Sequence, residues 1–292
     1  MEVRRLGSAD VDAASEILYE AFASVYRRRG HTPPFPNVES AVWLCRAYLD
    51  LDPEGCAVAV AGGAGSSISG VGFAHLRGRV ASIGPLAARP GGGAGRALMA
   101  HFHELARAAT SVRLFQDAFN PDSFGLYTRL GYRVVDVAPY LVAPRLLAPR
   151  ARPSGIRALA TSDVETIGLF DFARTGADRT RDLALLASTG RGFVAERGGQ
   201  LAGYLFYRQL PARIIVGPAL AETPELVADL VDAVADALPE RPAVIRASGG
   251  APAVLERAFA RGFRVDHLGN LMATGPYTPP PAQLYALFPE SL

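Results

Sequence analysis

The residues best suited to chemistry begin at a glycine-rich turn, Gly91-Gly92-Gly93-Ala94-Gly95, followed by Arg96. The residues before it predict a strand, and those after it have helical periodicity. A glycine turn that opens a helix directs several backbone N–H groups at one place and adds the positive end of the helix dipole. The sequence therefore predicts a site for phosphate or pyrophosphate.

Two common phosphate-binding motifs fit this turn poorly. Its glycines lack the G-x-G-x-x-G spacing of dinucleotide sites, and all 30 basic residues are arginine, so no Gly-Lys-Ser/Thr P-loop exists. The turn also follows what we expect to be an antiparallel meander, rather than the first strand of a domain.

A second candidate, Tyr127, lies beyond this turn. A phenol, with a pKa of ~10, can protonate a departing thiolate, whose thiol has a pKa of ~8.5. By itself, a tyrosine between Phe124 and Leu130 is more often a packed helix residue. The surrounding spacing decides between these interpretations.

That spacing is N-P-D-S-F-G-L-Y-T-R-L-G-Y over residues 120–132. It resembles the Asn-x-x-Ser/Ala-x-x-Leu-Tyr-x-Lys/Arg-x-Gly-Phe/Tyr signature of the GNAT superfamily of acyl-CoA-dependent N-acyltransferases. The expected order of elements over residues 1 to about 137 is similar to that superfamily too: a strand, two helices, three strands, the turn with its helix, a strand, a helix and a strand.

The resemblance implies acetyl-CoA as co-substrate, no metal, and a role for each matching position. Backbone groups of Leu86 and Ala88 would bind the pantetheine arm, and the turn with Arg96 would hold the pyrophosphate. Asn120 and Ser123 would steady the pantetheine, and Tyr127 would protonate the CoA thiolate. The turn departs from the usual pattern, because it directly follows Pro90, is about three residues short, and lacks the usual Gln or Arg.

An amine acceptor must lose a proton before it attacks, so a base or a water chain is expected. We select Asp117, near the end of its predicted strand. His75 and His31 remain alternatives, and Gln116 could face the cleft in place of Asp117.

The elements that position these residues follow from periodicity and turn signals. Helices are expected after Asp10, near Asn37, after the glycine turn and over 122–130. Strands are expected over 2–6, 56–61, 68–76, 80–88, 111–118 and 132–137.

The second half of the chain repeats the first in weaker form. Ile215-Val216-Gly217-Pro218 matches Ser82-Ile83-Gly84-Pro85, and Arg261-Gly262-Phe263 matches Leu130-Gly131-Tyr132, with offsets of about 133 and 131 residues. Prolines and arginines between the halves predict a linker. We therefore expect an α/β (α+β) fold of two tandem GNAT-like domains, each a mixed, mostly antiparallel sheet flanked by helices: domain 1–138 binding acyl-CoA, linker 139–154 and degenerate domain 155–292.

The second copy lacks the predicted chemistry. Glu222 and Glu225 stand where the glycine turn would be and would repel a pyrophosphate, and Ala258 stands in the place of Tyr127. The tail over 271–280 either closes over a cleft between the halves or packs as a strand end and loop.

Composition limits the possible partners. The net charge is +2, and the longest basic run is Arg27-Arg28-Arg29, which gives nucleic-acid or membrane-surface binding little support. Cys45 and Cys56 fit neither a disulfide framework nor a metal site, so we expect them to pack as small apolar residues. With no signal-peptide pattern and no apolar run near ~18 residues, we expect a cytoplasmic protein, preferably a monomer.

The predicted function is acetyl-CoA-dependent N-acetylation of a small-molecule amine, with catalysis in the N-terminal domain and the C-terminal domain shaping the acceptor site. The alternatives are a GNAT-like regulatory protein that binds CoA or a metabolite without turnover, and acylation of a protein or aminoacyl-nucleotide acceptor.

Overall fold

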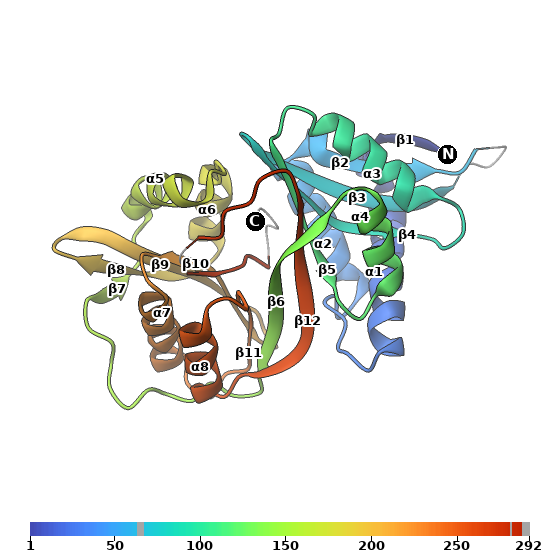
Figure 1. The fold of residues 1–292 in the computed structure, drawn as a ribbon. Coiled ribbons are helices and arrows are strands. Elements are labelled where there is room, and N and C mark those ends of the chain that lie inside the picture. Colours follow the sequence, from blue (N-terminus) through green and yellow to red (C-terminus); the bar gives the residue numbers. More distant parts are fainter. Residues whose placement is uncertain (63–66, 281, 288–292) are drawn as a thin grey trace. The chain divides into compact units, whose positions relative to one another are not determined.

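The computed structural model describes residues 1–62, 67–280 and 282–287. The chain folds into two compact units. Unit 1 contains Met1–Phe115, Phe119–Arg133 and Ala273–Gly275, and unit 2 contains Gln116–Ala118, Val134–Met272 and the tail from Pro276. Figure 1 shows their elements.

The two halves of the chain contain the same elements in the same order. The first half has β1 (Glu2–Arg5), α1 (Val11–Arg28), α2 (Val38–Leu51), β2 (Cys56–Val60), β3 (Ile68–Arg77), β4 (Val80–Ala88), α3 (Ala94–Leu105), β5 (Ser111–Asp117), α4 (Pro121–Arg129) and β6 (Arg133–Ala143). The second has β7 (Ile156–Ala158), α5 (Val164–Thr175), α6 (Thr180–Thr189), β8 (Arg191–Arg197), β9 (Gln200–Gln209), β10 (Ile214–Ala221), α7 (Pro224–Ala237), β11 (Ala243–Arg246), α8 (Pro252–Ala260) and β12 (Arg264–Thr274), followed by β13 (Gln283–Leu284). The predicted tandem fold is confirmed.

In unit 1 the strands lie in the order β1-β2-β3-β4-β5. Neighbours are antiparallel except β4 and β5, which are parallel and joined through α3. Successive residues of a strand point to opposite faces. On β3, Phe73 packs on Tyr48 of α2, whereas a Cβ at Gly72 would meet Phe102 of α3. Thus α2 and α3 cover opposite faces of this sheet.

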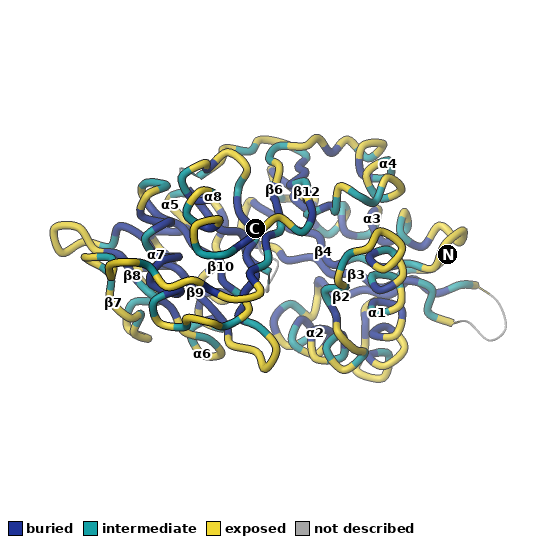
Figure 2. Tube along the Cα trace, turned by 90° about the horizontal axis from the view of Figure 1, so that it is seen from below, coloured by how far each residue is buried: buried dark blue, intermediate teal, exposed yellow. Residues whose placement is uncertain are grey.

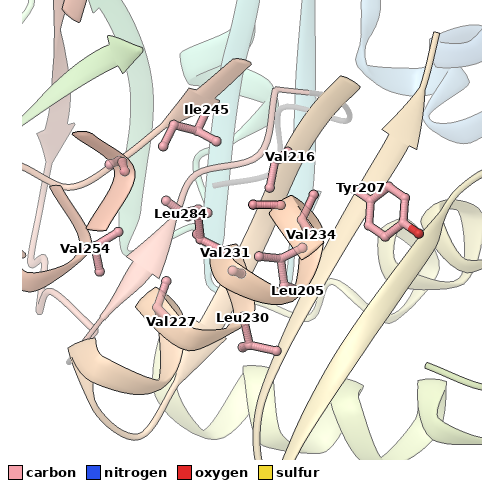
Figure 3. Packing of buried hydrophobic residues seen from close by; sticks show 14 of the residues in the cluster. Leu205, Tyr207, Val216, Val227, Leu230, Val231, Val234, Ile245, Val254 and Leu284 are labelled. Atoms are coloured by element: carbon pink, nitrogen blue, oxygen red, sulfur yellow. The ribbon is translucent and has the colours of Figure 1, made fainter. Parts of the chain in front are cut away.

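In unit 2 the order is β12-β6-β11-β10-β9-β8-β7, with β13 beside β10. Figure 1 shows β6 and β12 running next to each other. The same alternation divides its core, because Leu205 and Tyr207 of β9 pack in the cluster under α7, whereas Tyr204 and Phe206 pack in the cluster with α5 and α6. Figure 3 shows Leu230, Val231 and Val234 of α7 in the first cluster.

The helices form where apolar residues recur at helical spacing. α1, the helix expected after Asp10, buries Val11, Ala14, Ile17 and Leu18, and Figure 2 shows the alternation of buried and exposed positions along it. Gly131 and Gly262 follow α4 and α8 with φ of 87° and 90°, the left-handed conformation that ends a helix.

Both copies also begin with the same ion pair. Arg4 donates to both carboxylate oxygens of Asp10 at 2.7 and 2.8 Å, and Arg157 donates to those of Asp163 at 2.8 and 2.9 Å. Each aspartate also accepts a backbone N–H three residues earlier. Because this ion pair lies at the same place in both copies, it supports the internal repeat.

The boundary between the halves differs from the predicted one. The strand expected over 132–137 continues to Ala143, so residues 139–143 of the predicted linker belong to β6. The cause is tertiary: Tyr140–Ala143 pair with Arg246–Ala243 of β11, and Pro139, which lacks an N–H, still accepts from Ala247 through its carbonyl. None of the helices in the described ranges is long and apolar enough to cross a membrane.

Candidate functional site

β4 and β5 of unit 1 pair only at one end. Val80, Ala81 and Ser82 pair with Ser111, Val112 and Arg113, after which the two strands diverge. Among the described residues, no strand pairs with β4 on this side beyond Ser82. The backbone edge of β4 that contains Leu86 and Ala88 is therefore available to a ligand that can form hydrogen bonds with it.

A β-bulge in β4 accompanies the divergence. The β3–β4 pairing passes from Ala74↔Ile83 to Gly72↔Leu86, so Gly84 and Pro85 together face a single residue, Phe73. Such a bulge bends a strand and increases its twist, which turns the following residues away from the neighbouring strand.

The glycine turn leads from the end of β4 into α3. Gly91 and Gly93 have φ of 83° and 75°, and Gly93 is the N-cap of a helix that starts at Ala94. Because glycine has no side chain, it cannot cap the first N–H groups of α3, and the first turn contains no acidic residue. Arg96 lies exposed in that turn. The turn thus has the backbone donors and the charge that an anion requires.

Gly95 brings several predicted residues together. A Cβ at Gly95 would lie 3.8 Å from side-chain atoms of Leu86, Ala88 and Leu126. The end of β4, the start of α3 and the middle of α4 therefore meet at one point. The predicted pantetheine and pyrophosphate residues lie beside the helix that carries Tyr127.

Asn120 and Ser123 form the start of α4. The Asn120 side chain accepts the Ser123 backbone N–H at 3.4 Å, and the Ser123 hydroxyl donates to the Asn120 carbonyl at 3.0 Å. This reciprocal capping explains their spacing structurally. Beside them, a pocket of about 370 Å³ lies between the ends of α1 and α4, lined by Val25, Arg28, Arg29, Phe119, Asn120, Pro121 and Asp122.

Tyr127 is buried, with 8% of its surface exposed, and its ring centre lies 6.0 Å from that of Tyr132. The Tyr132 hydroxyl is within 3.0 Å of Nε2 of His103 on α3. Burial, together with the nearby Tyr127, raises the pKa of Tyr132, and burial lowers the pKa of His103. Tyr127 thus lies in a buried cluster with Tyr132, next to His103.

Two alternative bases have other roles in the structure. His75 is fully buried, with Nδ1 2.6 Å from Asp52 and Nε2 3.3 Å from the carbonyl of Gly84, so it cannot meet an acceptor. His31 stacks on Phe119 at 4.6 Å between ring centres.

Asp117, the selected base, belongs to unit 2. Its carboxylate lies 3.4 Å from Nε2 of His267, whose Nδ1 lies 2.8 Å from Asp266. The Gln116 side chain donates back to the Asp117 carbonyl. A carboxylate next to an imidazole can accept and pass on a proton. Sequence reasoning missed His267, although the adjacent Asp266-His267 pair on a strand was a signal.

In unit 2, a strand of the chain itself lies along the edge of β10 that corresponds to the available edge of β4. β10 and β11 also pair only briefly, at Ile214 and Ile215, and β13 enters beyond them, pairing with Ala219 and Leu220 of β10. The Tyr285 N–H donates to the carbonyl of Arg246, at the end of β11. Of the tail over 271–280, residues 271–274 form the end of β12 and the residues up to 280 form a loop, which is the second of the two options given for it.

In unit 2, the N-terminus of α7 carries a carboxylate of the chain itself, that of Glu225. Thr223 caps α7, and hydrogen bonds from the Glu225 backbone N–H and the Thr223 hydroxyl lower the pKa of Glu225. A carboxylate therefore lies where α3 presents backbone N–H groups and Arg96. This agrees with the expectation that only the first copy suits a pyrophosphate.

No family model and no curated protein matches the sequence. Solved structures do match the fold. A proposed acetyltransferase from Pyrococcus horikoshii is 18% identical, with a TM-score of 0.75, over 97% of this chain and 92% of its own. A GCN5-related N-acetyltransferase from Sphaerobacter thermophilus is 19% identical, with a TM-score of 0.66, over 95% and 96%.

A third structure is a tandem GNAT protein from the clavulanic acid biosynthesis pathway. It is 18% identical, with a TM-score of 0.60, over 95% of this chain and 99% of its own. At these identities the likeness concerns the fold alone. The chain therefore has the fold of a tandem GCN5-related N-acetyltransferase, as the signature over residues 120–132 predicts.

Proposed function

We propose that unit 1 is an acetyl-CoA-dependent N-acetyltransferase that acts on an amine of a small molecule. The observation that carries the proposal is the divergence of β4 from β5 next to an uncapped, glycine-rich helix N-terminus. This arrangement offers a strand edge to an amide-bearing arm and backbone donors to a pyrophosphate.

The residues of unit 1 fit acetyl-CoA. Leu86 and Ala88 would hydrogen-bond the pantetheine amides through their backbone, residues 91–95 and Arg96 would hold the pyrophosphate, and Asn120 and Ser123 would steady the arm at the start of α4. When bound, acetyl-CoA supplies the acetyl group and the thiolate leaving group. The pocket beside Asn120 supports a small acceptor, because its size suits one.

Two side chains would move protons in this reaction. Asp117 would take the proton from the acceptor ammonium, so that the amine lone pair can attack the acetyl carbonyl. Tyr127 would give its phenolic proton to the departing sulfur as a general acid, because a phenol, with a pKa of ~10, carries its proton at neutral pH. The new C–N bond replaces the C–S bond, the nitrogen releases its second proton to solvent, and the phenolate regains a proton from solvent.

Unit 2 is proposed to serve the acceptor side rather than to bind CoA. Its helix N-terminus carries Glu225, and β13 pairs with the strand edge that corresponds to residues 86–88 of β4.

The test is release of CoA thiol with acetyl-CoA and a panel of amino acids, polyamines, aminoglycosides and peptides, together with calorimetric titration with CoA. The proposal expects binding and amine-dependent thiol release. Binding without release for any amine would favour a regulatory CoA-binding protein, and no binding at millimolar CoA would reject both.

A further inference from the structure

We propose that His75 is a positioning residue that fixes the bulge of β4 and, through it, the strand edge at residues 86–88. This inference rests on the proposed function, in which that edge binds the pantetheine arm. His75 would act through the backbone and would not touch the substrate.

The His75 ring joins two parts of unit 1. Its Nδ1 lies 2.6 Å from Oδ2 of Asp52, and its Nε2 lies 3.3 Å from the carbonyl oxygen of Gly84. Both partners are acceptors, so a ring nitrogen that bonds either of them does so through its N–H. The ring is fully buried and packs on Tyr48 at 4.5 Å between ring centres, which leaves it little freedom to turn.

Asp52 is itself firmly held at the end of α2. Arg77 donates to the two carboxylate oxygens of Asp52 at 2.9 and 2.7 Å, and the Asp52 backbone N–H donates to the Tyr48 carbonyl at 2.7 Å. Burial alone would raise the pKa of the Asp52 carboxyl, but hydrogen bonds from His75 and Arg77 outweigh burial and hold the pKa well below its usual range. Asp52 is therefore a charged, fixed anchor for the imidazole.

Gly84 needs such a partner because of the bulge. It lies in the two-residue gap of the β3–β4 register, where the ladder between the strands is interrupted. The His75 Nε2–H provides a donor for its buried carbonyl. Leu86, which resumes the pairing with β3, follows only two residues later. The direction of the strand edge therefore depends on how the bulge is held.

Unit 2 shows the same bulge supported in a different way. Gly217 and Pro218 interrupt the β9–β10 register at the corresponding place, and Arg208 stands at the position of His75. There the strand after the bulge pairs with β13 at Ala219 and Leu220. β4 has no such strand among the described residues of unit 1, so its bulge depends more on the side chain behind it.

Two isosteric variants separate the two contacts of His75. In His75→Gln the amide nitrogen can reach the place of Nε2 and keep the bond to Gly84, whereas in His75→Asn it can reach only the place of Nδ1 and keep the bond to Asp52. Titration calorimetry with CoA is expected to give a Kd for His75→Gln within about threefold of the unmutated protein and a Kd for His75→Asn weakened about tenfold or more.

A second readout needs no ligand. In the free protein, amide hydrogen exchange at Ala87 and Arg89, whose N–H groups face β3, is expected to accelerate in His75→Asn and to stay unchanged in His75→Gln. Tyr204→Phe is the control, because it removes a buried hydrogen bond in unit 2 and should change neither the CoA Kd nor this exchange.

The outcomes distinguish this inference from the proposed function. If the unmutated protein binds no CoA, the proposed function fails, and the exchange comparison alone decides the role of His75. If both variants exchange and bind like the unmutated protein, the positioning role is overturned. Should the histidine variants not fold, Asp52→Asn replaces them. Exchange at Ala87 and Arg89 is then expected to accelerate more than exchange in the other strands of unit 1, and an equal acceleration throughout the unit would overturn the inference.

Discussion

Ala219 of β10 pairs antiparallel with Leu284 of β13. By the internal repeat, Ala219 corresponds to Leu86 of β4, one of the residues proposed to bind pantetheine. In unit 2, β13 thus occupies the strand position that the proposed function assigns to the cofactor arm in unit 1. Leu284 is also 1% exposed and packs in the main core of the unit, which Figure 3 shows.

The packing of β13 should therefore stabilise unit 2. Leu284→Ala is expected to lower the free energy of unfolding by about 2–5 kcal/mol, because it leaves a cavity in a packed core. Leu268→Ala, at a leucine on β12 that is 49% exposed, is the matched control and should cost less than about 0.5 kcal/mol. Urea unfolding followed by circular dichroism measures both, and equal small losses would contradict the packing role of the tail.

CoA should bind once per chain, at α3. Arg96→Glu places a carboxylate in the first turn of α3 and is expected to weaken the CoA Kd about tenfold or more at low salt, since it replaces attraction with repulsion at the helix N-terminus. Glu225→Arg makes the opposite change in α7 and should leave the stoichiometry and Kd unaltered. A second binding event in that variant would refute the assignment of CoA to unit 1 alone.

Tyr127→Phe should lower kcat by roughly 100-fold and leave the KM for acetyl-CoA nearly unchanged, because it removes a proton donor and little packing volume. Tyr132→Phe is the control: it is also buried, but its hydroxyl bonds His103. Steady-state thiol release measures both variants. Similar losses of kcat in the two would mean that the cluster, rather than the Tyr127 proton, matters.

Asp52 should make the free energy of unfolding depend on pH in the acidic range. Its folded-state pKa lies below the ordinary value of 3.8, so its contribution is complete above that pH and is lost as the pH falls further. Asp52→Asn should cost about 3–5 kcal/mol at pH 7, since it breaks a buried ion pair, and progressively less below pH ~4. Asp50→Asn, at an exposed aspartate of the same helix, should show no such trend. Thermal unfolding across pH tests this.

The two thiols should be silent in a thiol-release assay. Cys45 and Cys56 are free and buried, and burial, with a smaller effect of Asp52, raises the pKa of Cys56 to about 12. The native protein should therefore react negligibly with Ellman's reagent, and the denatured protein should release two equivalents per chain. Rapid reaction of the native protein would show that this part of unit 1 opens readily.

Local sequence signals predicted much of the fold correctly. The strand over 80–88, the glycine turn and the helix expected over 122–130, which the structure has at Pro121–Arg129, were all readable, because turns and helical periodicity depend on neighbours in the chain. The prolines after Val137 led to a linker being predicted from residue 139, which is wrong up to residue 143, because residues 139–143 belong to β6, which pairs with β11. The pairing partner lies about a hundred residues away, where no local pattern can specify it.

By itself the sequence determined the repeat and the GNAT-like order of elements, and it predicted an anion-binding turn and a role for Tyr127, because each depends on residue type and short spacing. Only the tertiary structure decided the rest. It buried His75 between Asp52 and Gly84, brought His267 to Asp117, and paired β13 with β10. These relationships join residues distant in the chain, and they arise from the packing of sheets and helices rather than from any local preference.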